Sequence, residues 1–441
     1  MLPGVLERLR ESNPWLFGGP AVGATPASRE PSGWRARRQV DAQALLAPGR
    51  AHLVIGPRQA GKSSLAWAAL RRKVRPLFLN LEEPALAAWC RSPSGFLADV
   101  ARAGLAPDAL FLEEAQRLEH AGLFVKGVVD LKPAYPVVVT GSSSFHLDDR
   151  VRESLAGRAT RHVLWPFSLA EVVPPGSGSG PAHLEILRRE AIARALRVGS
   201  YPEAWLSERP EAVLTDLYQA VVLRDASDRF AVERPDAYQK LLALAAGQVG
   251  YLVNQAEYAA LCGVAAGTVA KYLDLLEQTH VVRLVRPFAG GARREVTGAR
   301  KVFFVDNGLR HAALGRLRND PAEAADRGAL VENWVFGEVA KSLPWTLPIG
   351  YWRSLSGAEV DFVLDAPQAR LALEVKAGPL PRAVLSRGCR SFVEAYAPGE
   401  LWVLNDTLDA EATLGTTRVR WLPLHRLPEA LEQWREQNGI E

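Results

Sequence analysis

The sequence is poor in cysteine and has no long apolar run. Its three cysteines, Cys90, Cys262 and Cys389, are far apart, which argues against a disulfide framework and against a CxxC metal site. No apolar run approaches the roughly 20 residues that a membrane-spanning helix requires, and charges interrupt the N-terminus where a signal peptide needs an apolar segment. We therefore expect a cytoplasmic protein without a membrane segment.

A strong net charge is also lacking. The formal charge of +4 on 441 residues permits contact with a polyanion but does not indicate one. The length exceeds what one hydrophobic core usually organises, so several domains are expected. Four short apolar runs, "HLVIG", "PLFLNL", "DALFLEE" and "PVVVTGSS", are typical of buried parallel strands with helices between them. The predicted fold class is therefore α/β.

The pattern along the chain predicts five segments. Residues 1–40 form an N-terminal arm that opens with a short helix, and residues 41–173 form the α/β core. A stretch rich in Gly, Ser and Pro begins a helical connector or lid at residues 174–250. Residues 251–325 have the pattern of a winged helix, and residues 326–441 form a second α/β domain.

The stretch "GPRQAGKSS" lies between a predicted strand and an apolar helix and fits the phosphate-binding pattern G-x-x-x-x-G-K-[ST]. Glycines in such a loop let backbone N–H groups point at phosphates near a helix N-terminus. We expect Lys62 to neutralise the β- and γ-phosphates of ATP and the Ser63 hydroxyl to ligate Mg²⁺. The residues predicted to bind nucleotide are Gly56, Pro57, Arg58, Gln59, Ala60, Gly61, Lys62, Ser63 and Ser64.

ATP hydrolysis also requires carboxylates on a second strand, and "ALFLEEAQ" supplies a pair. Glu113 would take the metal side and Glu114 would activate the attacking water, although Asp is commoner at the first position. The alternative is a pair of solvated glutamates at a helix start, where acidic residues are favoured. A third strand, "VVVTGSSS", ends in hydroxyls, and Ser142 or Ser143 is expected to hold the water.

Arg158, in "RESLAGRATR", is the candidate for a cationic side chain that one subunit presents to the phosphates of its neighbour. The alternative is a solvated arginine near a helix end. The residues around it do not decide between the two.

The winged-helix pattern has Ala256–Leu261 as one helix and Ala266–Leu276 as a recognition-like helix, joined at Gly263. We expect Thr268 and Lys271 to face outward. The alternative is a winged helix that packs against protein, because the recognition-like helix carries one basic residue. The basic side chains expected to rest on phosphates are Arg293, Arg294, Arg300 and Lys301.

The stretch "GAEVDFVLDAPQARLALEVKAG" predicts two strands joined by a turn. Residues two apart on a strand share a face, so Glu374 and Lys376 point the same way, and pairing of the hairpin brings Asp361 beside them. A Mg²⁺-dependent phosphodiesterase needs such a group, with Asp361 and Glu374 as ligands and Lys376 to position the nucleophile or offset charge. Glu332, or as a second choice Glu338, on the preceding helix adds a ligand. The alternative is ordinary cross-strand salt pairing.

The motifs "LVIGPRQAGKSSL", "LFLEEAQ", "VVVTGSSS", "ESLAGRA", "PFSLAEV" and "GSYPEA" together resemble the prokaryotic AAA+ ATPases of the AAA-14 type. In these proteins the C-terminal half is a domain of unknown function that resembles PD-(D/E)XK nucleases. The resemblance covers the chain from about residue 38 to the end. It implies a homo-oligomeric ring, often a hexamer, with Arg158 acting on the neighbouring subunit, and it implies that Glu113 replaces the usual Asp.

The expected function is therefore an ATPase with ATP and Mg²⁺ as cofactors, coupling hydrolysis to remodelling or translocation of branched or double-stranded DNA. Junctions of the Holliday type, in DNA repair or recombination, are the implied setting, with a nuclease-like domain that binds DNA and is a candidate to cut it. The alternative is a nucleotide-dependent regulatory switch that acts through protein contacts without DNA cleavage. A defence-associated nuclease controlled by nucleotide is a third reading.

Overall fold

The computed structural model describes residues 3–17, 26–29, 38–141, 155–220, 232–288, 290, 298–318, 320 and 325–440. Contacts within the chain divide it into two compact units, Met1–Pro166 and Phe167–Glu441. Each unit has its own sheet and core, so the two are described one at a time.

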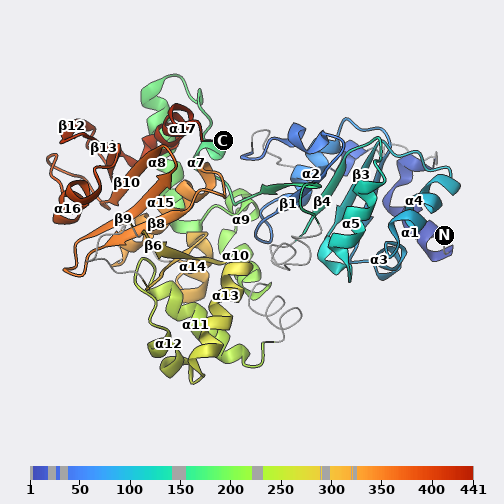
Figure 1. The fold of residues 1–441 in the computed structure, drawn as a ribbon, viewed down its shortest axis with the longest axis horizontal. Coiled ribbons are helices and arrows are strands. Elements are labelled where there is room, and N and C mark those ends of the chain that lie inside the picture. Colours follow the sequence, from blue (N-terminus) through green and yellow to red (C-terminus); the bar gives the residue numbers. More distant parts are fainter. Residues whose placement is uncertain are drawn as a thin grey trace. The chain divides into compact units, whose positions relative to one another are not determined.

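The first unit contains a parallel sheet in the order β2-β3-β4-β1-β5. Strands β1, β3 and β4 are labelled in Figure 1. The four strands predicted from apolar runs are confirmed, but β5 was not predicted. Its sequence "ATRHV" is half polar and half-buried along its whole length, so it lacks the apolar signal of a central strand. The strands are β1 (Ala51–Ile55), β2 (Pro76–Asn80), β3 (Ala109–Glu113), β4 (Val137–Thr140) and β5 (Ala159–Val163).

Helices cover both faces of this sheet. On one face α2 (Lys62–Leu70) packs its apolar side chains against the strands. The other face carries α1 (Pro3–Ser12), α3 (Pro84–Trp89), α4 (Pro93–Arg102) and α5 (Ala121–Asp130).

The segment expected to be an N-terminal arm packs into this core. Val5 and Leu9 of α1 are fully buried there. Asn13 then pairs with the edge strand β2: its Nδ2 donates to the Phe78 carbonyl at 2.9 Å, and its Oδ1 accepts from the Phe78 N–H at 2.7 Å. One side chain therefore satisfies backbone groups that an edge strand leaves unpaired.

The second unit begins with helices, and the residues predicted to form a winged helix contain two helices followed by a two-stranded ribbon. Gly263, with φ of +65°, ends the first helix of that module, and the two helices meet at 102°. The helices before the sheet are α7 (Leu169–Val172), α8 (Pro181–Val198), α9 (Pro202–Leu206), α10 (Pro210–Gln219), α11 (Pro235–Gly247), α12 (Gln255–Cys262) and α13 (Ala266–Gln278).

Eight of the described strands form one mixed sheet in the order β12-β13-β11-β10-β9-β8-β6-β7. The ribbon β6–β7 of the winged helix joins it because β6 runs parallel to β8, with Arg286 opposite Gly350 and Pro287 opposite Tyr351. The strands are β6 (Val282–Pro287), β7 (Lys301–Phe304), β8 (Ile349–Arg353), β9 (Glu359–Ala366), β10 (Ala369–Val375), β11 (Glu400–Asn405), β12 (Ala410–Leu414) and β13 (Thr417–Pro423).

Two core clusters flank this sheet. One contains side chains of α15 (Arg327–Ser342) and α17 (Leu427–Gln437), and the other contains those of α16 (Arg387–Tyr396). Helix α14 (Asn307–Leu314) follows β7 directly. Segments predicted as a winged helix and as a separate C-terminal domain thus share one sheet and one hydrophobic core.

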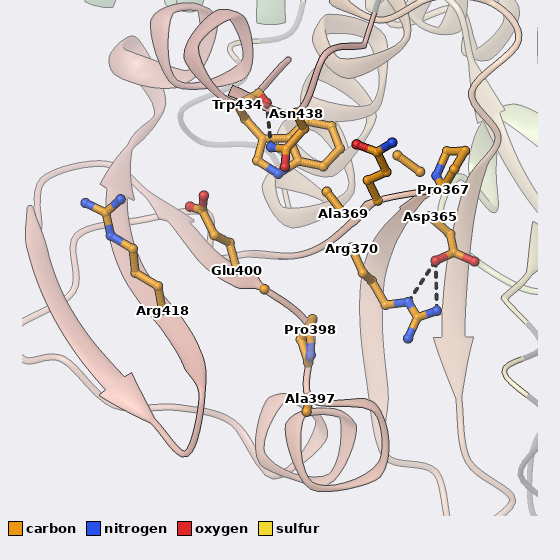
Figure 2. A pocket seen from close by; sticks show the side chains of 13 residues that line it. Asp365, Pro367, Ala369, Arg370, Ala397, Pro398, Glu400, Arg418, Trp434 and Asn438 are labelled. Atoms are coloured by element: carbon orange, nitrogen blue, oxygen red, sulfur yellow. Dashed lines mark hydrogen bonds and ion pairs between the residues drawn. The ribbon is translucent and has the colours of Figure 1, made fainter. Parts of the chain in front are cut away.

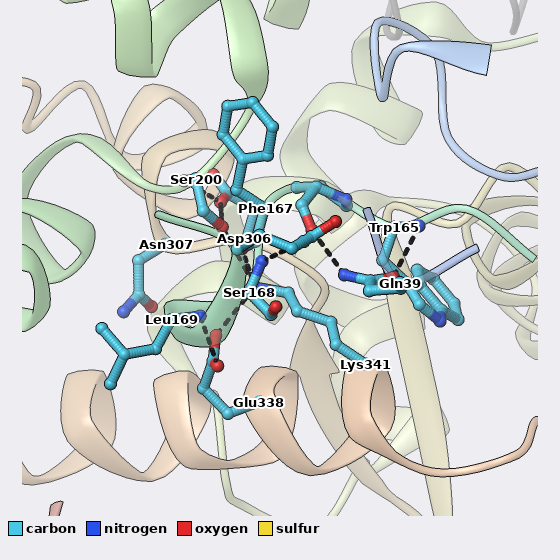
Figure 3. Close-up of polar contacts among 12 residues, drawn as sticks. Gln39, Trp165, Phe167, Ser168, Leu169, Ser200, Asp306, Asn307, Glu338 and Lys341 are labelled. Carbon is cyan, nitrogen blue, oxygen red and sulfur yellow. Dashed lines mark hydrogen bonds and ion pairs between the residues drawn. The ribbon is translucent and has the colours of Figure 1, made fainter. Parts of the chain in front are cut away.

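A buried polar network ties α15 to the start of the second unit (Figure 3). Lys341 Nζ donates to the Phe167 carbonyl at 2.9 Å, to Ser200 Oγ at 3.0 Å and to Glu338 Oε1 at 3.2 Å. Asp306 Oδ2 accepts from the Ser200 N–H at 2.6 Å and from its hydroxyl at 3.0 Å. Because each charge has several partners, burial is compensated.

No single helix among the described residues is both long and apolar enough to cross a membrane. The pair α12 and α13 reaches that threshold only when the two helices are counted together.

A histidine pair crosses from β1 to β5 in the first unit. His52 Nε2 lies 2.8 Å from the Ala47 carbonyl oxygen and must donate to it, so His52 Nδ1 accepts from His162 Nε2 at 3.1 Å. Burial, and then the charge of His52, lower the pKa of His162 to about 4. The His162 ring is therefore held neutral at pH 7.

This depressed pKa predicts acid sensitivity of the first unit. Between the unfolded pKa of 6.5 and the folded value of about 4 the unfolded state binds more protons, so stability falls as pH falls. From pH 7 to pH 4.5 the loss attributable to His162 is about 2 kcal/mol. Chemical denaturation of His162→Gln at both pH values should show a smaller loss than the wild type. The exposed His120→Gln is the control, and an unchanged loss in His162→Gln would contradict the assignment.

Candidate functional site

The loop predicted to bind phosphate connects β1 to α2. Gly56 has φ of +145°, and a Cβ atom there would lie 2.0 Å from the Leu164 carbonyl oxygen, so a larger residue is excluded. Gly61, with φ of +92°, is the left-handed N-cap of α2. Lys62 Nζ donates to the carbonyls of Gly56 at 3.1 Å and of Pro57 at 2.7 Å. The Lys62 ammonium is thus held by two carbonyl groups of its own loop.

Arg38 supports this loop from outside the motif. Its guanidinium is buried and donates from Nη1 to the Ala60 carbonyl at 3.1 Å and from Nη2 to the Trp165 carbonyl at 2.7 Å. The loop is therefore joined to the chain that follows β5. Sequence reasoning missed Arg38 because no local pattern links it to residues so distant in sequence.

The two glutamates at the end of β3 lie in different environments. Burial raises the pKa of Glu113, while a hydrogen bond with the Ser63 side chain lowers it. The two residues predicted to hold Mg²⁺ are therefore in direct contact. Glu114 has φ of +55°, an uncommon conformation for this residue type, and its carboxylate accepts a hydrogen bond from Gln116 Nε2.

Thr140 is a buried hydroxyl at the end of β4. It shares a strand face with Val138, which packs in the cluster that contains α2. Its side chain is 1% exposed, and its Oγ1 has no hydrogen-bond partner in the part of the chain that the structure describes. Such a group is uncommon in folded proteins. The sequence prediction assigned the holding of the attacking water to Ser142 or Ser143, which lie outside the described residues.

Arg158 lies at the opposite end of the sheet from the phosphate loop. It directly precedes β5, whereas the loop follows β1, and the two strands are parallel with Ala51 opposite Ala159. Five strand residues separate the two ends, a distance of roughly 15 Å or more. Arg158 Nε pairs with Asp130 Oδ1 at 2.5 Å, and the arginine side chain is more than one-third exposed. It therefore does not reach the loop of its own subunit.

In the second unit, the β9–β10 hairpin brings the predicted acidic residues together. The two strands are antiparallel, and their register, extended by one step, puts Glu374 opposite Asp361. Asp361 Oδ2 accepts a hydrogen bond from the Val375 N–H at 2.7 Å. Lys376 Nζ donates to Glu374 Oε1 at 2.6 Å.

Glu332 approaches the same hairpin from α15. Gly250 makes room for it, because a Cβ atom there would lie 2.9 Å from Glu332 Oε2. Glu332 Oε1 is buried and has no hydrogen-bond partner among the described residues. Glu338, the second choice on the same helix, instead belongs to the Lys341 network described above and accepts the Leu169 N–H at 2.8 Å.

Lys301 is the unexpected member of this group. It opens β7, is 2% exposed and forms an ion pair with Glu359 Oε1. Its Nζ also lies 3.6 Å from Glu332 Oε1 and 5.3 Å from the centroid of the Tyr351 ring. Arg353 Nη1 lies 3.5 Å from the other oxygen of Glu359. We call Glu332, Glu359, Asp361 and Glu374 the carboxylate cluster.

This position corrects one prediction. Lys301 was expected to rest on phosphates with other basic residues of the wing, but a buried ammonium that is paired with carboxylates does not contact a polyanion. Arg300 is half-buried, and Arg293 and Arg294 lie outside the described residues. No local sequence pattern indicates this role, because Lys301 is far from the hairpin along the chain.

The charges of the cluster perturb one another strongly. Burial raises the pKa of Asp361 well above its ordinary value, and Glu332 and Glu374 raise it further. Burial also raises the pKa of Glu332 to about 7 against the opposing effect of Lys301. For Lys301 itself burial would lower the pKa, but the nearby carboxylates outweigh burial and raise it. Burial and mutual repulsion therefore favour proton uptake by Asp361 and Glu332.

The donors are the hard oxygens that Mg²⁺ prefers, and Glu332 Oε1 already has one cation, the Lys301 ammonium, at 3.6 Å. As the side chains stand, however, the described chain has no group of three or more His, Cys, Asp or Glu residues arranged to hold a metal ion. Lys301 is close to Glu332 in this arrangement. The chemistry of the donors therefore fits a divalent cation, while their present geometry does not.

A pocket of about 530 Å³ lies at the other end of the same hairpin (Figure 2). Its charges are paired locally: Arg370 Nε donates to Asp365 Oδ1 at 2.9 Å, and Arg418 donates to Glu411 at 2.8 Å. The Arg370 guanidinium also lies 4.8 Å from the centroid of the Phe288 ring. The side chains of this pocket do not include the carboxylate cluster.

Three family models match successive parts of the chain. Residues 49–173 match a model described as an AAA domain. Residues 189–320 match a domain of unknown function (DUF8612), and residues 327–427 match another (DUF4143). The parallel sheet and phosphate loop of the first unit are consistent with a P-loop AAA+ core.

Two relatives found by sequence are both described as uncharacterized proteins. An uncharacterized protein of Mycobacterium tuberculosis (strain ATCC 25618 / H37Rv) is 28% identical over 366 residues, which are 80% of this chain and 76% of the relative. An uncharacterized protein of Haemophilus influenzae is 24% identical over 246 residues, which are 54% of this chain and 58% of the relative.

Among solved structures, the replication initiator DnaA bound to AMPPCP and single-stranded DNA matches with a TM-score of 0.25 and 16% identity, over 54% of this chain and 85% of DnaA. A signal transduction ATPase with numerous domains from Pyrococcus horikoshii matches with a TM-score of 0.28 and 11% identity, over 74% of this chain and 48% of that protein.

The unpartnered hydroxyl of Thr140 predicts a separable effect on hydrolysis. Thr140→Val keeps the shape of the side chain and removes a buried group that has no partner, so the Tm should be unchanged or higher. If the hydroxyl helps to orient the attacking water, kcat for ATP should fall by about 100-fold, with nucleotide affinity unchanged. Thr160→Val, on strand β5 of the same sheet, is the matched control. Equal kcat values for Thr140→Val and the wild type would exclude the role.

Proposed function

We propose that the chain is an ATPase of the AAA+ type that couples ATP hydrolysis to remodelling or translocation of branched or double-stranded DNA, with a second, Mg²⁺-dependent site for phosphodiester hydrolysis. The observation that carries the proposal is the convergence of Glu332, Asp361 and Glu374 at one hairpin, in a chain that also has a phosphate loop. The nuclease half of the proposal rests on this arrangement of side chains alone.

At the phosphate loop, the residues have separable tasks. Bound ATP with Mg²⁺ supplies the transferable phosphoryl group. Lys62 exchanges its bonds to the loop carbonyls for the phosphates, and Ser63 with Glu113 holds the metal side. Glu114 takes the proton of the attacking water, and the Thr140 hydroxyl, beside Ser142 or in its place, orients that water.

The position of Arg158 supports a homo-oligomeric ring. An arginine at the far end of the sheet cannot neutralise charge at its own loop, but it is exposed and so is available to the loop of a neighbouring subunit. A finger of this kind stabilises the charge of the transferring phosphoryl group. Its pairing with Asp130 holds it in the isolated chain. Heterologous contacts that close generate rings, of which a hexamer is one size.

At the carboxylate cluster, Asp361, Glu374 and Glu332 are the groups to bind Mg²⁺, which when bound would activate a water for attack on phosphorus. Lys376 is half exposed and bonded to Glu374, so it is placed between the cluster and solvent, where a phosphodiester would arrive. It positions the nucleophile or offsets the charge that develops on the phosphate.

The carboxylate cluster supports DNA as the partner more strongly than helix α13 does. On α13 Lys271 is exposed and Thr268 is half-buried, but Asp274 is exposed on the same helix. One lysine beside an aspartate is weak support for major-groove docking. We therefore place the DNA contact at the cluster rather than at α13.

One observation favours a second candidate function. The buried ammonium of Lys301 beside Glu332 and Glu359 makes the cluster resemble an ion-pair network. The second candidate is a nucleotide-dependent regulatory switch that acts through protein contacts, without DNA cleavage. In such a switch these residues would serve only as a structural ion-pair network.

The two candidates predict different results with DNA. ATP turnover and strand cleavage are measured with Mg²⁺ on single-stranded, duplex and four-way-junction DNA, for the wild type, Lys62→Ala and Asp361→Asn. The proposal expects junction or duplex DNA to stimulate turnover, and Lys62→Ala to abolish it. Asp361→Asn should lower cleavage by at least about two orders of magnitude with ATP turnover unchanged, because it removes a metal ligand only.

Asp365→Asn is the matched control, since Asp365 lies on the same strand but pairs with Arg370 away from the cluster. It should cleave like the wild type. If no DNA binds, stimulates turnover or is cut, the DNA proposal falls and the regulatory switch replaces it. Stimulation without cleavage would remove the nuclease half alone.

The ring predicts complementation between two inactive variants. Arg158→Ala should lose ATP turnover by about 1,000-fold, as Lys62→Ala does. In mixed rings, roughly a quarter of the interfaces would pair an intact loop with an intact Arg158. Turnover should therefore reappear on mixing and reach about a quarter of the wild-type value. Mixtures as inactive as their components would show that Arg158 does not act between subunits.

A further inference from the structure

Lys301, the buried cation that contacts the carboxylate cluster, comes from a different part of the chain than the carboxylates themselves. Glu359, Asp361 and Glu374 lie on the hairpin, and Glu332 lies on the helix before it. Lys301 lies at the start of β7, in the ribbon of the winged-helix module. The pairing of β6 with β8 carries that ribbon into the same sheet, and so places the lysine under the cluster.

Lys301 is the deeply buried member of three cations near the cluster. Its side chain is 2% exposed, whereas Arg353 is 37% and Lys376 is 46% exposed. Solvent screens the charge of the two exposed cations but not that of a buried one. Among these three, Lys301 therefore has the largest effect on a charge placed in the cluster.

The position of Lys301 conflicts with a metal at the same carboxylates. Its Nζ lies 3.6 Å from Glu332 Oε1 and is ion-paired with Glu359. A divalent cation bound by Glu332 and Asp361 would lie within a few ångströms of this ammonium and would be repelled by it. This conflict agrees with the lack of a metal-holding group among the described residues as they stand.

We propose that Lys301 is a built-in counter-ion of the carboxylate cluster, which competes with a divalent cation for these carboxylates and so sets the metal affinity of the site. This inference rests on the proposed phosphodiesterase site, because it assumes that a metal binds there. Lys301 acts as a positioning residue: it holds the cluster in its metal-poor arrangement and must withdraw, or share its partners, when the cation enters.

Metal binding tests this without any substrate. Binding of Mn²⁺ to the nucleotide-free, full-length protein is measured by electron paramagnetic resonance and calorimetry. Lys301→Met should bind at least about tenfold more tightly than the wild type, because a unit charge a few ångströms from the metal is removed. Lys301→Arg keeps the charge and should bind as weakly as the wild type. Lys301→Met combined with Glu332→Gln should lose the gain, which assigns the metal to the cluster.

Arg353→Met is the matched control. It removes a cation from the same partner, Glu359, but from the exposed side, so the affinity should change by less than about threefold. Circular dichroism and thermal unfolding check the fold of each variant. Mn²⁺ should raise the Tm of Lys301→Met more than that of the wild type, because binding to the folded state stabilises it in proportion to affinity.

The outcomes separate this inference from the function on which it rests. If Lys301→Met and the wild type bind Mn²⁺ equally well, Lys301 is no competitor, and the metal site stands without it. If neither binds Mn²⁺, both the inference and the nuclease half of the proposed function fail. If Arg353→Met gains as much affinity as Lys301→Met, the effect is one of general charge and the specific role of Lys301 is overturned.

Discussion

The second unit depends on the parallel pairing of β6 with β8. Two residue pairs, Arg286 with Gly350 and Pro287 with Tyr351, join a ribbon of one sequence segment to the hairpin of another. Once joined, the ribbon must bury its first residue, Lys301, and a buried ammonium requires nearby carboxylates. The ribbon also brings aromatic packing, since Phe303 lies 4.8 Å from Phe336 and 5.2 Å from Phe362 between ring centroids. The carboxylate cluster and the apolar core of this unit thus both depend on the pairing of β6 with β8.

The two buried lysines of this unit, Lys341 and Lys301, differ in how completely their ammonium groups are hydrogen-bonded. Lys341 donates to three acceptors at 2.9 to 3.2 Å, so its positive charge is fully used and replacing a partner would leave a buried group unmet. Lys301 has an ion pair with Glu359, a longer contact to Glu332 and the face of a ring, while a Glu332 oxygen is left without a hydrogen bond. The partners of Lys301 could therefore gain from binding another cation, whereas the partners of Lys341 could not.

Local sequence patterns predicted the strands and turns that depend on neighbouring residues. Apolar runs located β1 to β4, and the turn between "AEVDFVLD" and "RLALEVKAG" located the hairpin that sets Asp361 beside Glu374. The strand β5 was missed because it is half-buried and polar, and Arg38 and Lys301 were missed because each acts on residues distant in sequence. The same limit misplaced Lys301 on the surface: basic composition predicts exposure, whereas tertiary pairing decides burial. Thr140 was missed because an unpartnered hydroxyl is a property of packing, which sequence does not display.

The unbroken sheet also affects how the chain can be divided. The matches to two families end at residue 320 and begin again at residue 327, which suggests a natural place to cut. A fragment starting there would keep β8 to β13 but lose the ribbon, leaving β8 as a bare edge with unpaired backbone groups beside apolar side chains that Phe303 no longer covers. Such edges recruit other strands and promote aggregation. For this protein the unit of dissection is therefore the whole chain from Phe167 onward, and insolubility of a shorter piece would reflect a missing neighbour rather than an unstable domain.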